Sequence, residues 1–173
     1  MDHWNLIKGR YAEINFPVIF KQKYGKTLTD ILDTGWPNLF LISDKMKAIL
    51  EENKLTGWAT FSIKLYDKAG NEIFGYHGFS ITGQCGQVNY EKSEIIEKRK
   101  VPTGPTCQYY KGLSIDQLDG ADFFTPDKTC QIFITKRAAD VLKKNKITNM
   151  RLENLAEKET AVRYVKKDVD DIG

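Results

Sequence analysis

The pattern of apolar and polar positions occurs twice in this chain, in residues 40–61 and 132–153, which align without a gap at an offset of 92 positions. In both copies a short apolar stretch leads to a hydroxyl residue, Ser43 or Thr135. A hydroxyl at this position accepts a hydrogen bond from a backbone N–H group that the first turn of a helix leaves unpaired. The repeat therefore predicts two capped helices.

Apolar residues follow each cap three and four positions apart, which places them on one face of a helix. In the first copy Asn53 and Gly57 tolerate left-handed backbone angles, so they predict where the helix ends and the chain turns. Asn145 and Asn149 take these positions in the second copy. The apolar face comprises Met46, Ile49 and Leu50 in the first copy, and Ala138, Val141 and Leu142 in the second.

Alternating apolar and polar residues predict strands after the first helix. Residues 59–65 alternate as a half-buried strand does, residues 67–71 predict a hairpin loop, and residues 73–81 predict the returning strand. Met150 and Leu152 predict a shorter strand after the second helix. The predicted fold class is therefore α+β, with two helix–strand repeat units packed on a mostly antiparallel sheet.

The segments outside the repeat predict edges, turns and loops. Pro17 indicates an edge strand or a break, because proline has no N–H group for a sheet. Residues 83–86 predict a turn, and residues 98–105 predict a basic loop broken by prolines. We expect one domain over residues 1–157 that contains both copies of the repeat. A charged C-terminal tail follows in residues 158–173.

The composition indicates a folded protein of modest charge. The chain has 173 residues, of which 41% are hydrophobic and 12% aromatic. This is enough for one sizeable core or for two small lobes that share one, and too many aromatics for a disordered chain. A net charge of +3 does not by itself imply nucleic acid. The N-terminal residues show no signal-peptide pattern, and no apolar run is long enough to span a bilayer, so we expect a cytoplasmic protein without membrane contact.

The residues that could carry chemistry are few. Cys85, Cys107 and Cys130 are too widely spaced for a zinc motif, and their odd number argues against a disulfide framework. The chain contains no phosphate-binding glycine motif and no serine nucleophile motif, so we predict no cofactor and no metal. One enzyme hypothesis stays open, in which Cys85 is the nucleophile and His77 its base, although their spacing is no signature.

The two predicted helices differ in charge. Acidic and basic residues cancel on the first helix, whereas residues 136–146 carry a net charge of +4. Such a run is common on solvated helix surfaces, and cations near the C-terminal end also suit the helix dipole. The alternative is a docking surface. Weak binding of nucleic acid through this face is a further alternative, which we do not favour because no aromatic platform or groove-binding motif accompanies the charge.

The order of several short motifs resembles a bacterial family of immunity proteins that are found beside polymorphic or contact-dependent toxins. In that family a helix capped by serine occurs near the middle of the chain and again near its end. The resemblance covers roughly residues 36–155. The motifs are Trp36-Pro-Asn-Leu39, Leu41-Ile-Ser-Asp-Lys-Met46, Val88-Asn-Tyr-Glu-Lys-Ser93, Gly112-Leu-Ser-Ile-Asp116, Ala121-Asp-Phe-Phe124, Ile134-Thr-Lys-Arg-Ala138 and Ile147-Thr-Asn-Met-Arg-Leu152.

The resemblance implies a protein that binds a cognate protein toxin and neutralises it, which needs no cofactor and no catalytic residue. We therefore predict a binding protein rather than an enzyme, and the sequence predicts no oligomeric state. Loops and exposed faces are the default places for such contacts, and tyrosine and arginine are favoured interface residues. The candidate partner-binding residues are Arg99, Tyr109, Tyr110, Gln84, Arg137 and Lys144.

Overall fold

The computed structural model describes residues 3–126 and 131–162. The chain forms two compact units. Unit 1 comprises Met1–Cys85 and Leu118–Arg151, and unit 2 comprises Gly86–Gln117 and Leu152–Gly173. Both copies of the predicted helix therefore belong to unit 1. The expectation of one domain over residues 1–157 stays a prediction.

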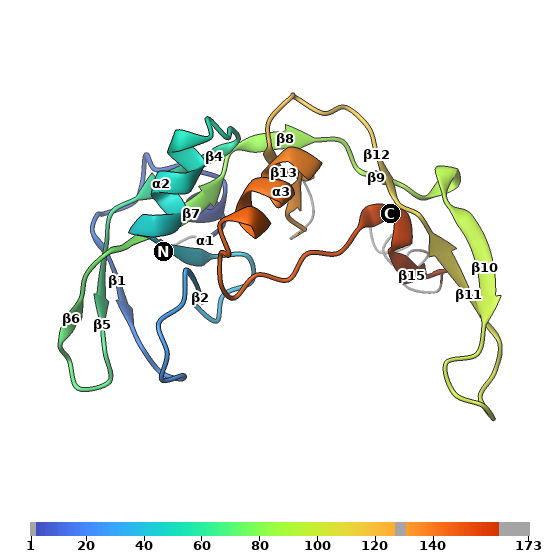
Figure 1. Ribbon diagram of the computed structural model, residues 1–173, viewed down its shortest axis with the longest axis horizontal. Helices are drawn as coiled ribbons and strands as arrows, with labels where there is room; N and C mark the ends of the chain where they lie inside the picture. Colours follow the sequence, from blue (N-terminus) through green and yellow to red (C-terminus); the bar gives the residue numbers. More distant parts are fainter. Residues whose placement is uncertain (1–2, 127–130, 163–173) are drawn as a thin grey trace. The chain divides into compact units, whose positions relative to one another are not determined.

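A four-stranded antiparallel sheet lies at the centre of unit 1 (Figure 1). Its inner strands carry buried side chains such as Ile42 and Phe79, which explains why these segments are apolar. The strand predicted over residues 73–81 is interrupted, because Gly75 adopts a φ of 81°. In order across the sheet, the strands are β2 (Ile31–Asp33), β3 (Phe40–Ser43), β7 (Tyr76–Ile81) and β4 (Trp58–Phe61).

A second sheet of unit 1 contains the predicted hairpin. The loop between its strands is closed by Asp67, whose Oδ1 accepts from the backbone N–H of Asn71 at 2.8 Å. Pro17 lies directly before an edge strand, as predicted. A short helix, α1 (His3–Ile7), buries Leu6 in a cluster with Leu39 and Phe61. The strands are β1 (Val18–Lys21), β5 (Ile63–Tyr66) and β6 (Glu72–Ile73), in the order β1-β5-β6, with β1 parallel to β5.

The turn predicted at residues 83–86 is wrong for its first three residues, which form a strand. A Cβ atom on Gly83 would lie 2.2 Å from the carbonyl oxygen of Phe123. The glycine therefore permits a close approach between two strands, where the sequence suggested a turn. This third sheet of unit 1 has the order β14-β13-β8 and comprises β8 (Gly83–Cys85), β13 (Phe123–Pro126) and β14 (Phe133–Ile134).

The two capped helices form where the sequence predicts them, as α2 (Asp44–Glu52) and α3 (Lys136–Lys144). The hydroxyl of Ser43 accepts from the backbone N–H of Met46 at 3.2 Å, and Thr135 caps α3 in the same way. The predicted apolar faces enter one core, in which Leu50 and Leu142 are almost fully buried beside Ile42 and Phe79.

Unit 2 contains two small sheets. β10 (Glu94–Lys98) and β11 (Cys107–Lys111) form an antiparallel hairpin, whose connection contains the basic loop predicted from the sequence. β15 (Glu159–Ala161) pairs with β11, so the tail expected from Lys158 begins with a strand. The tail residues 163–173 lie outside the described residues. The other elements are β9 (Val88–Asn89), β12 (Ser114–Ile115) and short 3₁₀ turns at Tyr90–Lys92 and Leu155–Glu157.

The predicted α+β class is confirmed, with more strand than helix and mostly antiparallel pairing. The prediction of a strand after each helix holds only for the first copy, in which β4 follows α2. Residues 145–154 form turns and irregular backbone, so the strand predicted at Met150 and Leu152 is wrong. The chain passes from unit 1 to unit 2 after Arg151. Glu153 is exposed at the position that corresponds to the buried Phe61 of the first copy.

Candidate functional site

The helices α2 and α3 of unit 1 bury their apolar faces in the same hydrophobic core. The Lys45 ammonium, at the start of α2, donates to the carbonyl of Lys146 just past the end of α3, at 3.4 Å. The Arg137 guanidinium, at the start of α3, donates to the carbonyl of Asn53 just past the end of α2, at 2.6 Å. Each helix therefore begins beside the end of the other. These contacts satisfy carbonyls that a helix end leaves without a partner.

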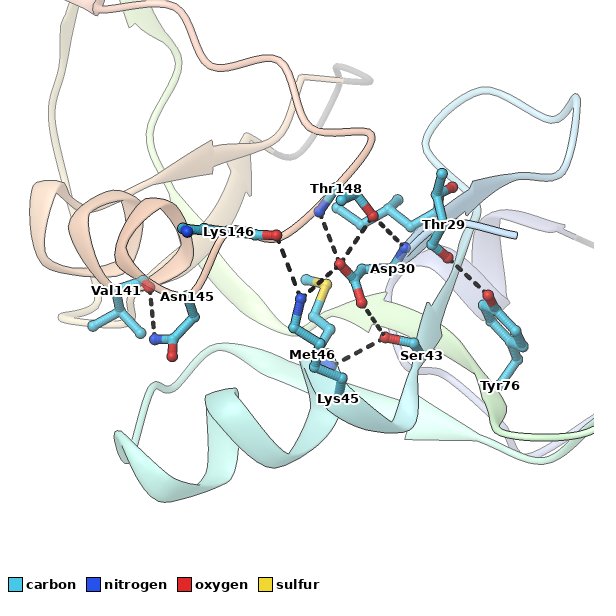
Figure 2. A network of polar contacts seen from close by, with 11 residues as sticks. Thr29, Asp30, Ser43, Lys45, Met46, Tyr76, Val141, Asn145, Lys146 and Thr148 are labelled. Atoms are coloured by element: carbon cyan, nitrogen blue, oxygen red, sulfur yellow. Dashed lines mark hydrogen bonds and ion pairs between the residues drawn. The ribbon is translucent and has the colours of Figure 1, made fainter. Parts of the chain in front are cut away.

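A buried carboxylate, Asp30, holds one of these two ends together (Figure 2). Its Oδ1 accepts from the Ser43 hydroxyl at 3.0 Å, so the residue that caps α2 is itself anchored. Its Oδ2 accepts from the backbone N–H and the hydroxyl of Thr148, both at 2.9 Å, and from the Lys45 ammonium at 3.1 Å. Asp30 thus connects the start of α2 with the turn that follows α3.

The surroundings of Asp30 favour its ionised form. Burial acts to raise the pKa of the Asp30 carboxyl, but the hydrogen bonds from Thr148, Lys45 and Ser43 outweigh this effect and hold the pKa below its ordinary value. The carboxylate therefore remains ionised at neutral pH and can accept all of these hydrogen bonds.

A second buried carboxylate, Asp122, makes the corresponding contacts at the other end of the helix pair. Its Oδ1 accepts from the hydroxyl of Thr135 at 2.8 Å. Its Oδ2 accepts from the backbone N–H of Thr56 at 3.1 Å and from the Arg137 guanidinium at 2.9 Å. Asp122 thus connects the start of α3 with the turn that follows α2.

Each residue that contacts Asp30 has a counterpart 92 positions away in the chain, which is the offset of the repeat, and these counterparts contact Asp122. Asp30 and Asp122 lie 92 positions apart, and so do the other partners. Both carboxylates precede the repeat segments 40–61 and 132–153, so sequence reasoning missed their role, although Asp122 belongs to the motif Ala121-Asp-Phe-Phe124. Extending the alignment upstream to a shared Asp, ten residues before the apolar entry of each copy, would have found both. The corresponding pairs are Ser43 and Thr135, Lys45 and Arg137, and Thr56 and Thr148.

The predicted partner-binding residues of α3 differ in how they are held. The Arg137 side chain is 55% exposed, but its guanidinium already donates to Asp122 and to the carbonyls of Asn53 and Lys54, just past the end of α2. Lys144 is exposed at the C-terminal end of α3. Arg137 therefore has an internal partner, whereas Lys144 faces solvent.

Gln84, the third predicted residue of unit 1, lies in β8 beside Thr125 of β13. Its backbone N–H donates to Oδ2 of Asp119 at 2.6 Å. Its side chain is half-buried. The backbone of Gln84 is therefore held in a sheet, where the sequence predicted a turn.

The other three predicted residues belong to the β10–β11 hairpin of unit 2. Arg99 is exposed in the loop and donates from Nε to the Thr106 hydroxyl at 3.1 Å. Tyr109 is only 5% exposed, and the ammonium groups of Lys98 and Lys100 lie 5.3 and 5.1 Å from its ring centroid. Tyr110 is half-buried, on the opposite face of β11 from Tyr109. Arg99 and part of Tyr110 are therefore accessible, whereas the buried ring of Tyr109 makes cation–π contacts with Lys98 and Lys100.

A family model described as an immunity protein family (Imm11) matches residues 4–157 of this chain. The chain belongs to the Imm11 immunity protein family. The match includes α2, α3 and both buried carboxylates, together with the β10–β11 hairpin. A comparison with curated proteins finds no match.

In this Imm11 protein, the two residues of the enzyme hypothesis have separate surroundings. Cys85 is 8% exposed in β8, where it is in register with Pro126 of β13. His77 lies in β7, and its Nε2 is 2.6 Å from Oδ1 of Asp44 in the first turn of α2. The structure therefore gives His77 a carboxylate partner on the helix side of the sheet, and it buries the proposed nucleophile.

The remaining chemical expectations concern metals, thiols and membranes. Among residues 3–126 and 131–162, no three His, Cys, Asp or Glu side chains are grouped so that they could hold a metal ion. Cys107 is partly exposed, whereas Cys130 lies outside the described residues. None of the helices in the described part of this Imm11 protein is long and apolar enough to cross a membrane.

Proposed function

We propose that this Imm11 protein binds a cognate protein toxin and blocks its activity without catalysing a reaction. The observation that carries the proposal is the family match over residues 4–157, which includes elements of both units. Membership of an immunity family supports a binding role. The toxin itself is proposed to be the product of a neighbouring toxin-like gene.

The surroundings of the chemically reactive residues support a role without catalysis. Cys85 is buried, and a buried thiol is a poor nucleophile unless its thiolate is stabilised. His77 already contacts Asp44. The two buried carboxylates at the helix ends accept hydrogen bonds from caps and turns, so they serve the fold.

The accessible members of the predicted set are our candidates for toxin contact. Arg99 and Tyr110 lie on the hairpin of unit 2, and Lys144 lies on α3 of unit 1. Tyr109, Gln84 and Arg137 would act by supporting these surfaces, since each is buried or bonded within its own unit. Arginine and tyrosine at such positions can supply much of the binding energy of an interface.

Two experiments test the function directly. The first co-expresses the protein with the toxin domain of the neighbouring gene and measures cell survival. The second measures binding of the two purified proteins by pull-down and calorimetry. We expect protection and a stable complex. Survival that stays at the level of cells expressing the toxin alone, together with no complex, would rule out the proposal.

The cysteine enzyme hypothesis has a separate test. We expect iodoacetamide to modify Cys107 in the folded protein and to leave Cys85 unmodified, because Cys85 is buried. A C85S/H77Q variant should still protect cells from the toxin. Rapid alkylation of Cys85, combined with loss of protection in this variant, would favour the enzyme hypothesis.

A further inference from the structure

The two helices carry opposite charges at corresponding C-terminal positions. α2 ends with Glu51 and Glu52, and α3 has Lys143 and Lys144 at the positions 92 residues later. The caps and turns around these positions are otherwise alike: Asn53 and Asn145 each donate from their side chain to the carbonyl four residues earlier. The reversal of charge therefore changes the surface of the helix end and leaves its backbone conformation unchanged.

Within the part of the chain that the structure describes, the basic residues at the end of α3 lack partners, whereas several other charged residues of the helix pair have one. Lys47 pairs with Glu51 on α2 at 2.6 Å, but Ala139 takes the place of Lys47 on α3. At the start of α3, Lys136 pairs with Asp140 at 2.5 Å. Within residues 3–126 and 131–162, by contrast, no hydrogen bond or ion pair holds the ammonium groups of Lys143, Lys144 and Lys146, and all three residues are exposed.

Folding alone does not account for three unpaired lysines at one helix end. The helix dipole favours cations there, but only weakly at an exposed site. Lys143 and Lys144 lie in the last turn of α3 and Lys146 follows just past its end, and like charges so close together repel each other and offset this gain. α2 forms the same turn with Glu51 and Glu52 in place of lysines. The fold therefore tolerates either sign of charge at these positions.

Two carboxylates near the C-terminal end of α3, those of Asp30 and Asp44, already have partners. Asp30 lies beneath the turn that follows α3, and it accepts from Thr148, Lys45 and Ser43. Asp44, in the first turn of α2, contacts His77. The Lys45 ammonium bonds to Asp30 and to the Lys146 carbonyl, so the Asp30 carboxylate already has a cationic partner (Figure 2). This end of the helix pair is therefore a basic surface.

We propose that Lys143, Lys144 and Lys146 form the docking surface for a carboxylate-rich patch on the cognate toxin. This inference rests on the proposed function and specifies the chemistry of the partner. Unpaired, exposed lysines at the end of a helix attract an acidic surface over a distance and raise the rate of encounter. A protein patch fits better than nucleic acid, because residues 136–149 contain no aromatic side chain on which a base could stack.

The test compares charge variants by stopped-flow association with the toxin domain of the neighbouring gene. K143E/K144E gives α3 the residues that α2 carries at the corresponding positions. We expect its association rate constant to fall at least ~10-fold at low ionic strength, with a weaker dependence on salt and an unchanged urea midpoint. K143Q/K144Q should show a smaller decrease, because it removes charge without reversing it.

K23E/K26E is the matched control, since it changes the net charge equally on exposed residues outside both helices. We expect it to associate with the toxin at nearly the wild-type rate. An equal decrease for K23E/K26E and K143E/K144E would show an effect of overall charge and overturn the inference.

Two further outcomes separate this inference from the proposed function. If the wild-type protein binds the toxin and K143E/K144E associates at the same rate, the docking surface is wrong while the function stands. If the wild-type protein does not bind the toxin, both fail. Binding of a 20-base-pair DNA or RNA duplex that K143E/K144E abolishes, with toxin association unchanged, would assign the surface to nucleic acid and overturn the inference.

Discussion

Asp122 illustrates how much of the structure depends on single buried residues. Its carboxylate is almost entirely buried and joins Thr135, Arg137 and the backbone of Thr56, which lies 66 positions earlier in the chain. Spacing rules for helices link residues three or four positions apart, so they could predict Thr135 as a cap but gave no reason to connect it with Asp122. Asp30 was missed for the same reason, since its partner Thr148 is 118 positions away.

Truncating Asp122 should strongly destabilise the protein. In Asp122→Ala the Arg137 guanidinium and the Thr56 N–H lose a buried acceptor, so we expect the free energy of unfolding to fall by about 3 kcal/mol. Asp122→Asn, which keeps one acceptor oxygen, should lose less. Asp140→Ala is the control, because its exposed pair with Lys136 should be worth at most about 0.5 kcal/mol. Urea unfolding measures all three, and equal losses for Asp122→Ala and Asp140→Ala would contradict the assignment.

Asp30 should make the stability of the protein depend on pH. The pKa of its carboxyl is lower in the folded state than its ordinary value, so the ionised group stabilises the fold above the unfolded-state pKa. That contribution is lost as the pH falls through the folded-state pKa. We expect the wild-type free energy of unfolding to decrease more steeply than that of Asp30→Asn as the pH falls below about 4. Urea titrations at pH 5, 4 and 3 measure the slopes, and parallel slopes would exclude Asp30 as a contributor.

Among the elements, the helices and their caps were the most predictable. Ser43 and Thr135 act as caps, and Leu50 and Leu142 of the two apolar faces are buried. Capping and the apolar face of a helix both follow from residues within one or two turns, so local patterns could predict them. The strands after the helices were less predictable. Met150 and Leu152 have apolar side chains at strand spacing, but the backbone that follows α3 continues into unit 2 instead of pairing as β4 does.

Gly57 should tolerate no side chain, because its backbone angle is left-handed and a neighbouring strand leaves no space for a Cβ atom. It has a φ of 83°, and a Cβ atom there would lie 2.1 Å from the carbonyl oxygen of Phe123. We expect Gly57→Ala to lower the free energy of unfolding by more than about 3 kcal/mol, through backbone strain and the clash together. Gly70→Ala separates the two causes, since Gly70 has a φ of 94° with no atom near its Cβ position, and it should cost about 1 kcal/mol. A similar cost for both variants in thermal unfolding would argue against the clash.

At the scale of the molecule, the stability of unit 1 is concentrated around the helix pair and the four-stranded sheet. Its largest core cluster combines α2, α3, β3 and β7, whereas the loop of the β10–β11 hairpin is exposed over most of its length. We expect amide hydrogen exchange to be slowest in peptides from β3 and β7 and fastest in residues 99–106, because exchange follows burial and hydrogen bonding. Equal protection of the two regions by mass spectrometry would contradict this distribution.

The predicted binding residues show where sequence reasoning stops. Arg99, Tyr109 and Tyr110 were chosen by residue type and Arg137 and Lys144 by charge, and neither criterion indicates whether a side chain is already engaged. The structure shows that Arg137 bonds to the backbone just past the end of α2 and that Tyr109 is buried, while Lys144 faces solvent. Exposure and internal pairing depend on contacts between distant segments, so they could not be predicted from local patterns.

The sequence by itself determined the α+β class, the positions of both helices and their caps, and the resemblance to immunity proteins. These properties rest on patterns within a few residues or on the order of short motifs along the chain. Tertiary structure alone decided that each helix is tied to the other by a buried carboxylate, that residues 83–85 form a strand, and that three lysines at the end of α3 lack partners within the described residues. Each of these depends on segments far apart in the chain, which meet only when the core brings them together.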